Sequence, residues 1–149
     1  MAIDITSLDK EQRSMLLIGD ILEIWEASVR ASHRFLTEED IGSLYPQAED
    51  AVRQIETLWV MQDGPRPVGF MGVQERKIEM LFLHPDYFRK GLGKIFVELA
   101  FRDLNVEYVD VNEQNPDAVK FYERMGFRTF HRDATDDQSN PFPILRMKK

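Results

Sequence analysis

The residues with the clearest chemical meaning form a basic turn punctuated by glycines. Gly91 and Gly93 are preceded by Arg89 and Lys90 and followed by Lys94, between an apolar strand and an amphipathic helix. Glycines let a backbone approach a ligand closely, and the free N–H groups that begin a helix attract anions. The turn is therefore expected to hold a phosphate-bearing ligand.

The charge of this turn contrasts with that of the whole chain. Its basic side chains are close together, whereas the 149-residue chain has a formal net charge of -7. General affinity for nucleic-acid phosphates needs an extended basic face, which this composition does not provide. The sequence therefore predicts a specific anionic ligand and no nucleic-acid partner, and the net negative charge favours cationic substrates.

Two nucleotide-binding fingerprints fail at this turn. A Walker-type loop needs glycine where the chain has Phe88, and Ser or Thr where it has Ile95. A dinucleotide fingerprint needs a third glycine where Phe96 stands and follows the first strand of a parallel unit. Here the turn follows an expected antiparallel meander, so both fingerprints are excluded.

A second segment, downstream of the turn, comprises residues 112–115 and the string of residues 121–127. Together with the strand of residues 78–85 and the turn of residues 89–94, it resembles the GNAT superfamily, the acyl-CoA-dependent N-acyltransferases. The stretch of residues 25–40 is similar to one in a bacterial, uncharacterised branch of that superfamily. The resemblance covers nearly the whole chain, because the order and spacing of the elements also match.

The resemblance implies that acetyl-CoA is the co-substrate. Backbone groups of Leu81 and Leu83, on either side of Phe82, would hydrogen-bond the pantetheine arm like an added strand. As side chains, these three residues are expected to belong to the core. Amides of the turn would hold the pyrophosphate, and the turn residues are Arg89, Lys90, Gly91, Leu92, Gly93 and Lys94.

The chain departs from the family pattern at the start of the turn. The family usually has Gln or Arg where this chain has Phe88, and often has glycine where it has Arg89. One side-chain contact with phosphate is therefore expected to be missing. The backbone amides do not depend on side chains, and Arg89 could supply the charge from the next position, so the site is expected to survive.

Acyl transfer from a thioester to an amine needs a neutral nucleophile, a stabilised oxyanion and a proton for the leaving thiolate. The resemblance assigns Tyr122 as the general acid for the thiolate. A tyrosine of ordinary pKa, about 10, carries its proton at neutral pH. The alternative role of Tyr122 is that of a half-buried aromatic residue on a helix face.

A lysine-like amine has a pKa of about 10.4, so a base or a water relay must remove a proton. Glu79 is the first candidate, because it interrupts an apolar strand beside the expected cofactor site. Partial burial there would raise its pKa. The alternative for Glu79 is a solvated carboxylate on the strand face, and Glu113 is the reserve candidate for the base.

Three further polar residues are candidates for the site. Asn112 and Asn115 could orient the thioester arm or a water molecule, and Asn115 could also cap the helix that starts at Pro116. His33, in the junction between the first two helices, could contact the acceptor or relay a proton, or it could be a structural residue. Asp136 and Asp137 are expected on a solvated face, although one could rim the acceptor entrance.

The chain is expected to be a single domain over residues 1–149. The fold class is α/β (α+β), a mixed, mostly antiparallel twisted sheet of six to seven strands flanked by about four helices. The first helix is predicted at 10–32. The second is predicted to start at residue 37, to break at Pro46 and to resume over 51–55. A third starts at residue 92, with apolar positions 95, 96, 99 and 100 on one face, and a fourth covers 116–125. Strands are predicted at 57–61, 68–73, 77–83, 108–111, 127–131 and 143–147.

The expected activity is transfer of an acetyl group from acetyl-CoA to a primary amine by direct attack in a ternary complex. An acyl-cysteine intermediate is excluded because the chain has no cysteine, and no metal site is expected. The alternative is a non-catalytic CoA-binding regulatory module, which Phe88 slightly favours. The acceptor is a small-molecule amine or a peptide or protein amine, and a homodimer is possible.

The expected location is the cytoplasm. No apolar run approaches the roughly 20 residues that a membrane span needs. The N-terminal residues have no basic region followed by an apolar core, so no secretion signal and no membrane partner are expected.

Overall fold

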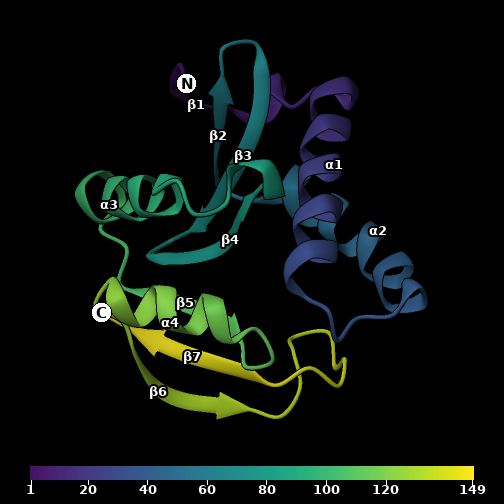
Figure 1. Ribbon diagram of the computed structural model, residues 1–149, viewed down its shortest axis with the longest axis vertical. Coiled ribbons are helices and arrows are strands. Elements are labelled where there is room, and N and C mark those ends of the chain that lie inside the picture. Colours follow the sequence, from purple (N-terminus) through teal and green to yellow (C-terminus); the bar gives the residue numbers. More distant parts are fainter.

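The computed structural model describes all 149 residues and contains seven strands and four α-helices (Figure 1). In chain order the elements are β1 (Ile3–Ser7), α1 (Met15–Ser32), α2 (Glu38–Gln54), β2 (Thr57–Asp63), β3 (Arg66–Gln74), β4 (Lys77–Leu83), α3 (Leu92–Leu104), β5 (Tyr108–Asn112), α4 (Pro116–Arg124), β6 (Arg128–Asp133) and β7 (Ile144–Lys148). Short 3-10 turns occupy Lys10–Gln12 and Pro85–Tyr87.

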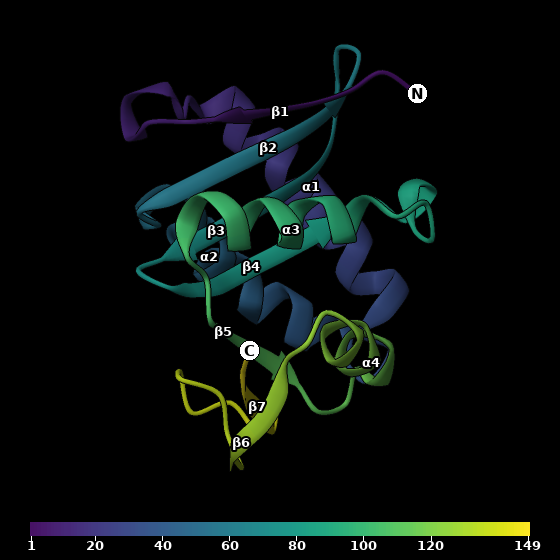
Figure 2. The ribbon, with the colours of Figure 1, turned by 90° about the vertical axis from the view of Figure 1, so that its left-hand side faces the viewer.

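All seven strands form one sheet in the order β1-β2-β3-β4-β5-β7-β6. Every neighbouring pair is antiparallel except β4 and β5, which run parallel. Helices α3 and α4 lie on one face of the sheet and α1 and α2 on the other (Figure 2). The predicted fold class, a mixed and mostly antiparallel sheet flanked by four helices, is confirmed.

Two hydrophobic cores follow from the alternation of side chains along the strands. On β2, Trp59 and Met61 face α3 and α4, whereas Leu58 and Val60 face α1 and α2. On β3, Phe70 lies on the α1 face, and Met71 on the α3 face. The sheet thus separates the layer of α1 and α2 from the layer of α3 and α4, and β4 lies between the two layers.

The helical prediction at the N-terminal side needs two corrections. The predicted helix over residues 10–32 is interrupted, because Ser14 caps α1 by accepting a hydrogen bond from the Leu17 N–H at 3.2 Å. Pro46 does not break α2, which is continuous from Glu38 to Gln54. Buried Ile41 and Val52 anchor the helix on both sides of the proline, and this packing outweighs the missing hydrogen bond.

Three other predictions differ in detail. Strand β1 was not expected; it adds an edge strand to the predicted meander of β2, β3 and β4. In α3, Ile95 is exposed and Val97 is buried in its place, so the buried face runs through Leu92, Phe96 and Ala100. The predicted bounds of the last two strands are each within two residues of the observed ones.

No helix is both long enough and apolar enough to cross a membrane.

Candidate active site

A free strand edge lies at the centre of the sheet. Strands β4 and β5 pair only at Lys77–Tyr108 and Ile78–Val109, and then diverge. The His84 N–H donates to the Val68 carbonyl at 2.8 Å, which fixes the side of β4 that faces β3. Because backbone groups alternate along a strand, those of Leu81 and Leu83 face away from β3, into the gap beside β5.

The side chains of this edge belong to the core, as the alternative role predicted. Leu81 and Leu83 pack against the core under α3 and α4, and Phe82 packs against the core under α1 and α2. The three side chains are partly buried in this packing, and the backbone groups of Leu81 and Leu83 remain available to a ligand. An extended ligand can pair with such an edge as an additional strand does.

A β-bulge places Glu79 where the edge becomes free. Gly72 of β3 pairs with Met80, and Val73 pairs with Ile78, so Glu79 is the extra residue of β4. A bulge bends its strand and redirects the side chain of the unpaired residue. The carboxylate of Glu79 consequently lies at the start of the gap between β4 and β5.

The glycine turn has the backbone expected of an anion site. Gly91 is the N-cap of α3 with φ of 77°, a left-handed conformation that glycine adopts without strain. Arg89 also has a positive φ, 61°. An arginine adopts this conformation at a cost of roughly 1–2 kcal/mol, which a glycine would avoid.

Gly93 joins the turn to α4. A Cβ atom at this position would lie 3.2 Å from Cζ of Phe121 and 3.9 Å from Cδ1 of Leu83. A side chain here would therefore press on Phe121 of α4 and would contact Leu83 at the end of β4 at an ordinary distance. The two sequence segments that carry the resemblance converge at this glycine.

A hydrogen-bonded brace supports the segment that leads into the turn. The hydroxyl of buried Tyr87 donates to Oδ2 of Asp63 at 2.6 Å, and Oδ1 of the same carboxylate accepts from the Ala2 N–H at 2.9 Å. Arg66 lies over the Tyr87 ring and pairs with Asp86 at 3.4 Å. The β2–β3 hairpin thereby fixes the 3-10 turn that precedes Arg89.

Tyr122 lies on the inner face of α4 and is 8% exposed. Its ring makes edge contacts with Phe121 and Phe127, at centroid distances of 5.0 and 5.7 Å. Its hydroxyl makes no hydrogen bond within the protein, and it is not sealed from solvent. Burial raises the pKa of Tyr122 above its ordinary value, so the hydroxyl keeps its proton at neutral pH.

The two asparagines stand at the end of β5, where α4 begins. Oδ1 of Asn115 accepts from the Ala118 N–H at 3.3 Å, which confirms its role as the N-cap of α4. Oδ1 of Asn112 accepts from the Gln114 N–H at 2.9 Å. Both amide oxygens are thus used in local structure, and a role in binding stays a prediction.

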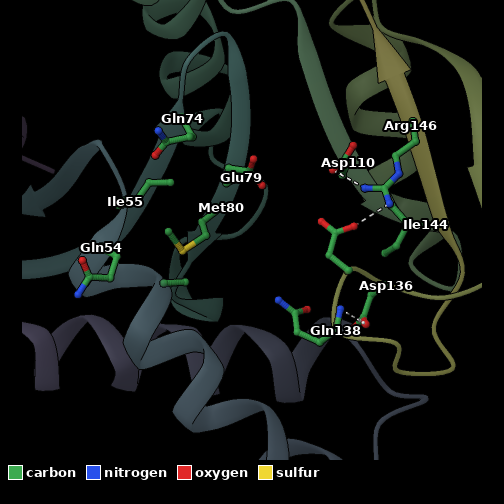
Figure 3. A pocket seen from close by; sticks show the side chains of 12 residues that line it. Gln54, Ile55, Gln74, Glu79, Met80, Asp110, Asp136, Gln138, Ile144 and Arg146 are labelled. Atoms are coloured by element: carbon green, nitrogen blue, oxygen red, sulfur yellow. Dashed lines mark hydrogen bonds and ion pairs between the residues drawn. The ribbon is translucent and has the colours of Figure 1, made fainter.

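A cavity of about 430 Å³ opens beside Glu79, on the face of the sheet covered by α2 (Figure 3). Four carboxylates line it, with Arg146 as the one cationic lining residue. The twelve lining residues are Ala51, Gln54, Ile55, Gln74, Glu79, Met80, Asp110, Asp136, Asp137, Gln138, Ile144 and Arg146. The cavity is acidic, with a few apolar side chains in its walls.

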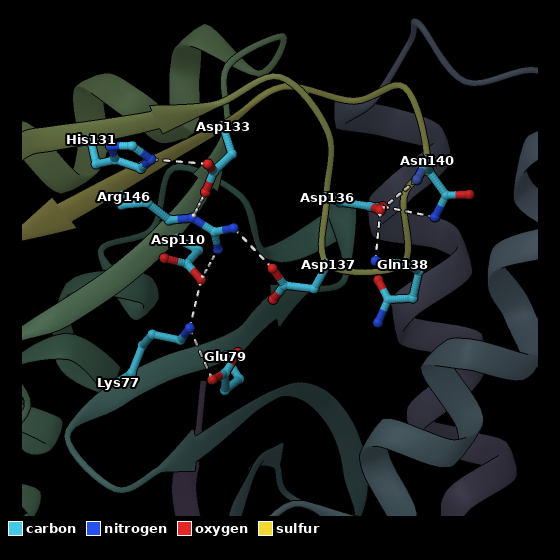
Figure 4. Close-up of polar contacts among 10 residues, drawn as sticks. All are labelled: Lys77, Glu79, Asp110, His131, Asp133, Asp136, Asp137, Gln138, Asn140 and Arg146. Carbon is cyan, nitrogen blue, oxygen red and sulfur yellow. Dashed lines mark hydrogen bonds and ion pairs between the residues drawn. The ribbon is translucent and has the colours of Figure 1, made fainter.

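Glu79 belongs to an ion-pair network (Figure 4). Nζ of Lys77 lies 3.3 Å from Oε1 of Glu79 and 2.6 Å from Oδ2 of Asp110. Burial raises the pKa of Glu79, and the Lys77 ammonium partly offsets that rise. The direction of this pKa shift is the one expected for Glu79. The side chain is paired with Lys77 yet remains 34% exposed, so both roles considered for Glu79, the general base and the solvated carboxylate, stay predictions.

His33 follows α1 and packs in an aromatic cluster. Its ring centroid is 5.6 Å from Phe35 and 6.4 Å from Phe82, and Phe35 in turn contacts Phe142. Burial lowers the pKa of His33 to about 4, so the ring is neutral at pH 7. His33 does not line the acidic cavity, but its cluster connects the α1–α2 junction with β4 and with the segment before β7.

Glu113, the reserve candidate for the base, is engaged elsewhere. It forms an ion pair with Arg132 of β6, and both side chains are exposed. It does not line the acidic cavity. No group of three or more His, Cys, Asp or Glu side chains is arranged to hold a metal ion.

Comparison with known proteins decides the family. Residues 35–149 match the family described as "Acetyltransferase (GNAT) domain". The chain belongs to the GNAT family. This GNAT protein is an acetyltransferase that uses acetyl-CoA, and the resemblance in its two motif segments is confirmed.

Relatives of this GNAT protein include a "Peptidyl-lysine N-acetyltransferase YjaB" of Salmonella typhimurium, 37% identical over 128 residues, or 85% of this chain and 88% of that protein. The solution structure of apo YjaB from Escherichia coli has a TM-score of 0.85 and 33% identity, with 99% and 97% of the two chains covered. A PaiA N-acetyltransferase from Thermoplasma acidophilum, solved with coenzyme A, has the same fold, with a TM-score of 0.71, 20% identity and complete coverage of both chains.

Several cavity residues were missed or misread in the sequence. Asp110 alternates with buried valines along β5, and this polar position in an apolar strand could have marked it as a candidate site residue. Asp136 and Asp137 were expected on a solvated face, yet both line the cavity, one of the two outcomes left open for them. Nothing in the local sequence indicated Arg146, because its importance depends on partners from β5 and from the preceding loop.

Proposed function

We propose that this GNAT acetyltransferase transfers the acetyl group to the side-chain amine of lysine in a peptide or protein. The observation that carries the proposal is the acidic cavity beside Glu79, at the point where β4 and β5 diverge. Its carboxylates complement a lysine ammonium, and its apolar residues Ile55, Met80 and Ile144 complement the methylene stem. The peptidyl-lysine acceptors named for the YjaB relatives have the same chemistry.

The cofactor side of the proposed site is made of backbone groups. The outward-facing edge at Leu81 and Leu83 suits the amide-containing pantetheine arm. The left-handed backbone at Gly91 and the first amides of α3 suit the pyrophosphate. Acetyl-CoA bound in this way supplies a thioester whose acetyl group can be attacked by an amine.

Glu79 is the proposed general base. Its carboxylate lies at the bulge of β4 and lines the cavity, so it can face both the acceptor amine and the start of the free edge. A raised pKa makes this carboxylate a better proton acceptor than an ordinary one. Glu79 would take a proton from the ammonium of the acceptor, directly or through water.

Tyr122 is the proposed general acid. Its hydroxyl keeps its proton at neutral pH and has no hydrogen-bond partner within the protein, so it is free to donate to a ligand. It would give that proton to the leaving thiolate as the carbon–sulfur bond breaks. Because the chain has no cysteine, attack by the amine in a ternary complex is the simplest route.

A peptide panel tests this proposal. The protein is given acetyl-CoA and blocked peptides that contain either lysine or norleucine, together with a peptide that has a free N-terminus and no lysine. Thiol release is followed, and the product is identified by mass spectrometry. We expect acetylation at the lysine Nζ only. Acetylation of the free N-terminus alone, or thiol release with none of the peptides, would contradict the proposed acceptor.

A further inference from the structure

Lys77 forms the first of the two residue pairs that join β4 to β5. It pairs with Tyr108, and beyond the next pair the two strands separate. Its ammonium contacts Asp110 on β5 at 2.6 Å and Glu79 on β4 at 3.3 Å. One cation therefore bridges both strands at the point where the gap opens.

The bridge continues through Arg146 of β7. Oδ2 of Asp110 accepts from Nη1 of Arg146 at 2.6 Å, as well as from Lys77. The same guanidinium donates from Nε to Asp133 at 2.8 Å and from Nη2 to Asp137 at 2.9 Å. A continuous series of ion pairs thus runs from Glu79 to the loop that forms the far wall of the cavity (Figure 4).

The series is shielded more than an ordinary surface network. The side chains of Asp110 and Arg146 are 17% and 18% exposed, and that of Lys77 is 29% exposed. Exposed ion pairs contribute little because water and salt screen them, whereas partly buried pairs are screened less. The series can therefore hold its members in place.

We propose that Lys77 is a positioning residue for the acetyl transfer: it holds the Glu79 carboxylate at the opening between β4 and β5 and connects it, through Asp110 and Arg146, to the loop that bears Asp137. This inference rests on the proposed role of Glu79 as the base. Lys77 keeps its own charge throughout. The proton that Glu79 accepts comes from the acceptor ammonium, and the electron pair left on the amine forms the new bond to the acetyl carbon.

Among the charged groups that face Glu79, Lys77 is the one that is positively charged. From its own strand Glu79 faces the ammonium of Lys77, and from β5 and the loop it faces the carboxylates of Asp110 and Asp137. Arg146 of β7 contacts those two carboxylates and not Glu79. Lys77 alone favours the charged form of Glu79, and the two aspartates oppose it.

Removing the charge of Lys77 and removing the charge of Asp137 should shift the pKa of Glu79 in opposite directions. In Lys77→Met the pKa of Glu79 rises, because the favourable charge is lost. In Asp137→Asn it falls, because a like charge is lost. Lys77→Arg keeps the charge and is the matched control, and it should restore most of the wild-type behaviour.

The test titrates the Glu79 carboxyl carbon by NMR in protein labelled with 13C-glutamate, with Glu79→Gln used to assign the signal. We expect the titration midpoint to move up in Lys77→Met and down in Asp137→Asn, and to return toward wild type in Lys77→Arg. Steady-state kinetics at pH 7 should show kcat lowered roughly tenfold in Lys77→Met, a smaller loss than the roughly 10²–10⁴-fold expected when a general base is removed completely. KM for acetyl-CoA should stay unchanged.

Two results would overturn the inference, and they are distinguishable. Midpoints that do not move in Lys77→Met and Asp137→Asn would remove the positioning role while leaving the base in place. Full activity of Glu79→Gln would remove the base and, with it, the role of Lys77. Should Lys77→Met fail to fold, Lys77→Gln removes the same charge with a polar side chain, and an unmoved Glu79 midpoint in that variant would overturn the inference.

Discussion

The two sides of the gap between β4 and β5 are built by different means. On the proposed cofactor side, the groups that face the gap are backbone groups of β4 and of the turn before α3, which are close together in sequence. On the proposed acceptor side, the cavity is lined by side chains from α2, β3, β4, β5, β7 and the loop before β7. One side depends on local conformation, and the other on residues brought together by the fold.

This difference predicts which departures from the family pattern the site can tolerate. Phe88 replaces a polar side chain next to the turn, yet the left-handed Gly91 and the free amides of α3 remain. A change of charge in the cavity has no such reserve, because each carboxylate there is itself a proposed binding group for the acceptor. We therefore expect substitutions on the acceptor side to alter specificity and catalysis, and most substitutions on the cofactor side to alter affinity for acetyl-CoA by small factors.

The largest effect is expected where the two sides meet, at Tyr122. Tyr122→Phe removes the hydroxyl and keeps the edge contacts of the ring with Phe121 and Phe127. Loss of a general acid should lower kcat by about 10²–10⁴-fold. Binding of CoA, measured by calorimetry, should change less than threefold, roughly the effect of losing one weak hydrogen bond. A kcat within twofold of wild type would remove Tyr122 from the chemistry.

Glu79→Gln should have the next largest effect, a loss of activity of roughly 10²-fold at pH 7. The raised pKa of Glu79 means that wild-type activity falls as pH drops through that pKa, since the protonated carboxyl cannot accept a proton. At higher pH the deficit of the variant should shrink, because more of the lysine acceptor, of pKa about 10.4, is already neutral. A pH–rate profile for both proteins measures this, and a constant deficit at every pH would argue against Glu79 as the base.

The aromatic cluster around His33 should make stability depend on pH. The folded-state pKa of His33, about 4, lies below its unfolded value of about 6.5, so the unfolded chain binds a proton first. Stability is then retained above pH 6.5 and is lost as pH falls toward 4, by up to about 3 kcal/mol. Urea unfolding of wild type and His33→Phe across this range tests the effect. The variant should lose less stability on acidification, and equal losses would show that His33 is not responsible.

The smallest effect is expected at Arg89, where conformation and charge can be separated. Arg89→Gly relieves a positive φ and should raise the free energy of unfolding by about 1 kcal/mol. Arg89→Ala keeps the strain. If the guanidinium supplies the phosphate contact that Phe88 lacks, both variants should bind CoA about tenfold more weakly, in line with a lost charge-assisted hydrogen bond. Unchanged CoA affinity in both would mean that the backbone alone holds the pyrophosphate.

The contrast between the two sides also decides how much could be predicted from sequence. The glycine turn, the apolar strand before it and the cap at Asn115 are local patterns, and all three have the expected backbone. The bulge at Glu79 and the short pairing of β4 with β5 have no local signal, because both depend on the register between strands. Predicting Glu79 was possible only because a charged residue interrupts an apolar strand.

Two failures of prediction have the same physical origin. Pro46 is a helix breaker by local propensity, but packing of Ile41 and Val52 keeps α2 continuous, and α2 supplies one wall of the cavity. Arg146 has no distinctive signal in its own strand. It gains its role from three aspartates on different elements, Asp110 of β5, Asp133 of β6 and Asp137 of the loop before β7. Long-range packing and pairing, which composition and periodicity do not encode, built the acceptor side.

The central claim is that acetyl-CoA lies along the backbone of β4 while the lysine acceptor occupies the acidic cavity. A crystal structure with a conjugate in which CoA is joined to the side chain of a lysine peptide tests this most directly. We expect the pantetheine to pair with Leu81 and Leu83, the sulfur to lie near the Tyr122 hydroxyl, and the lysine stem to pass Glu79 into the cavity. A structure in which the peptide runs from the sulfur over another part of the protein and leaves the acidic cavity empty would contradict this claim.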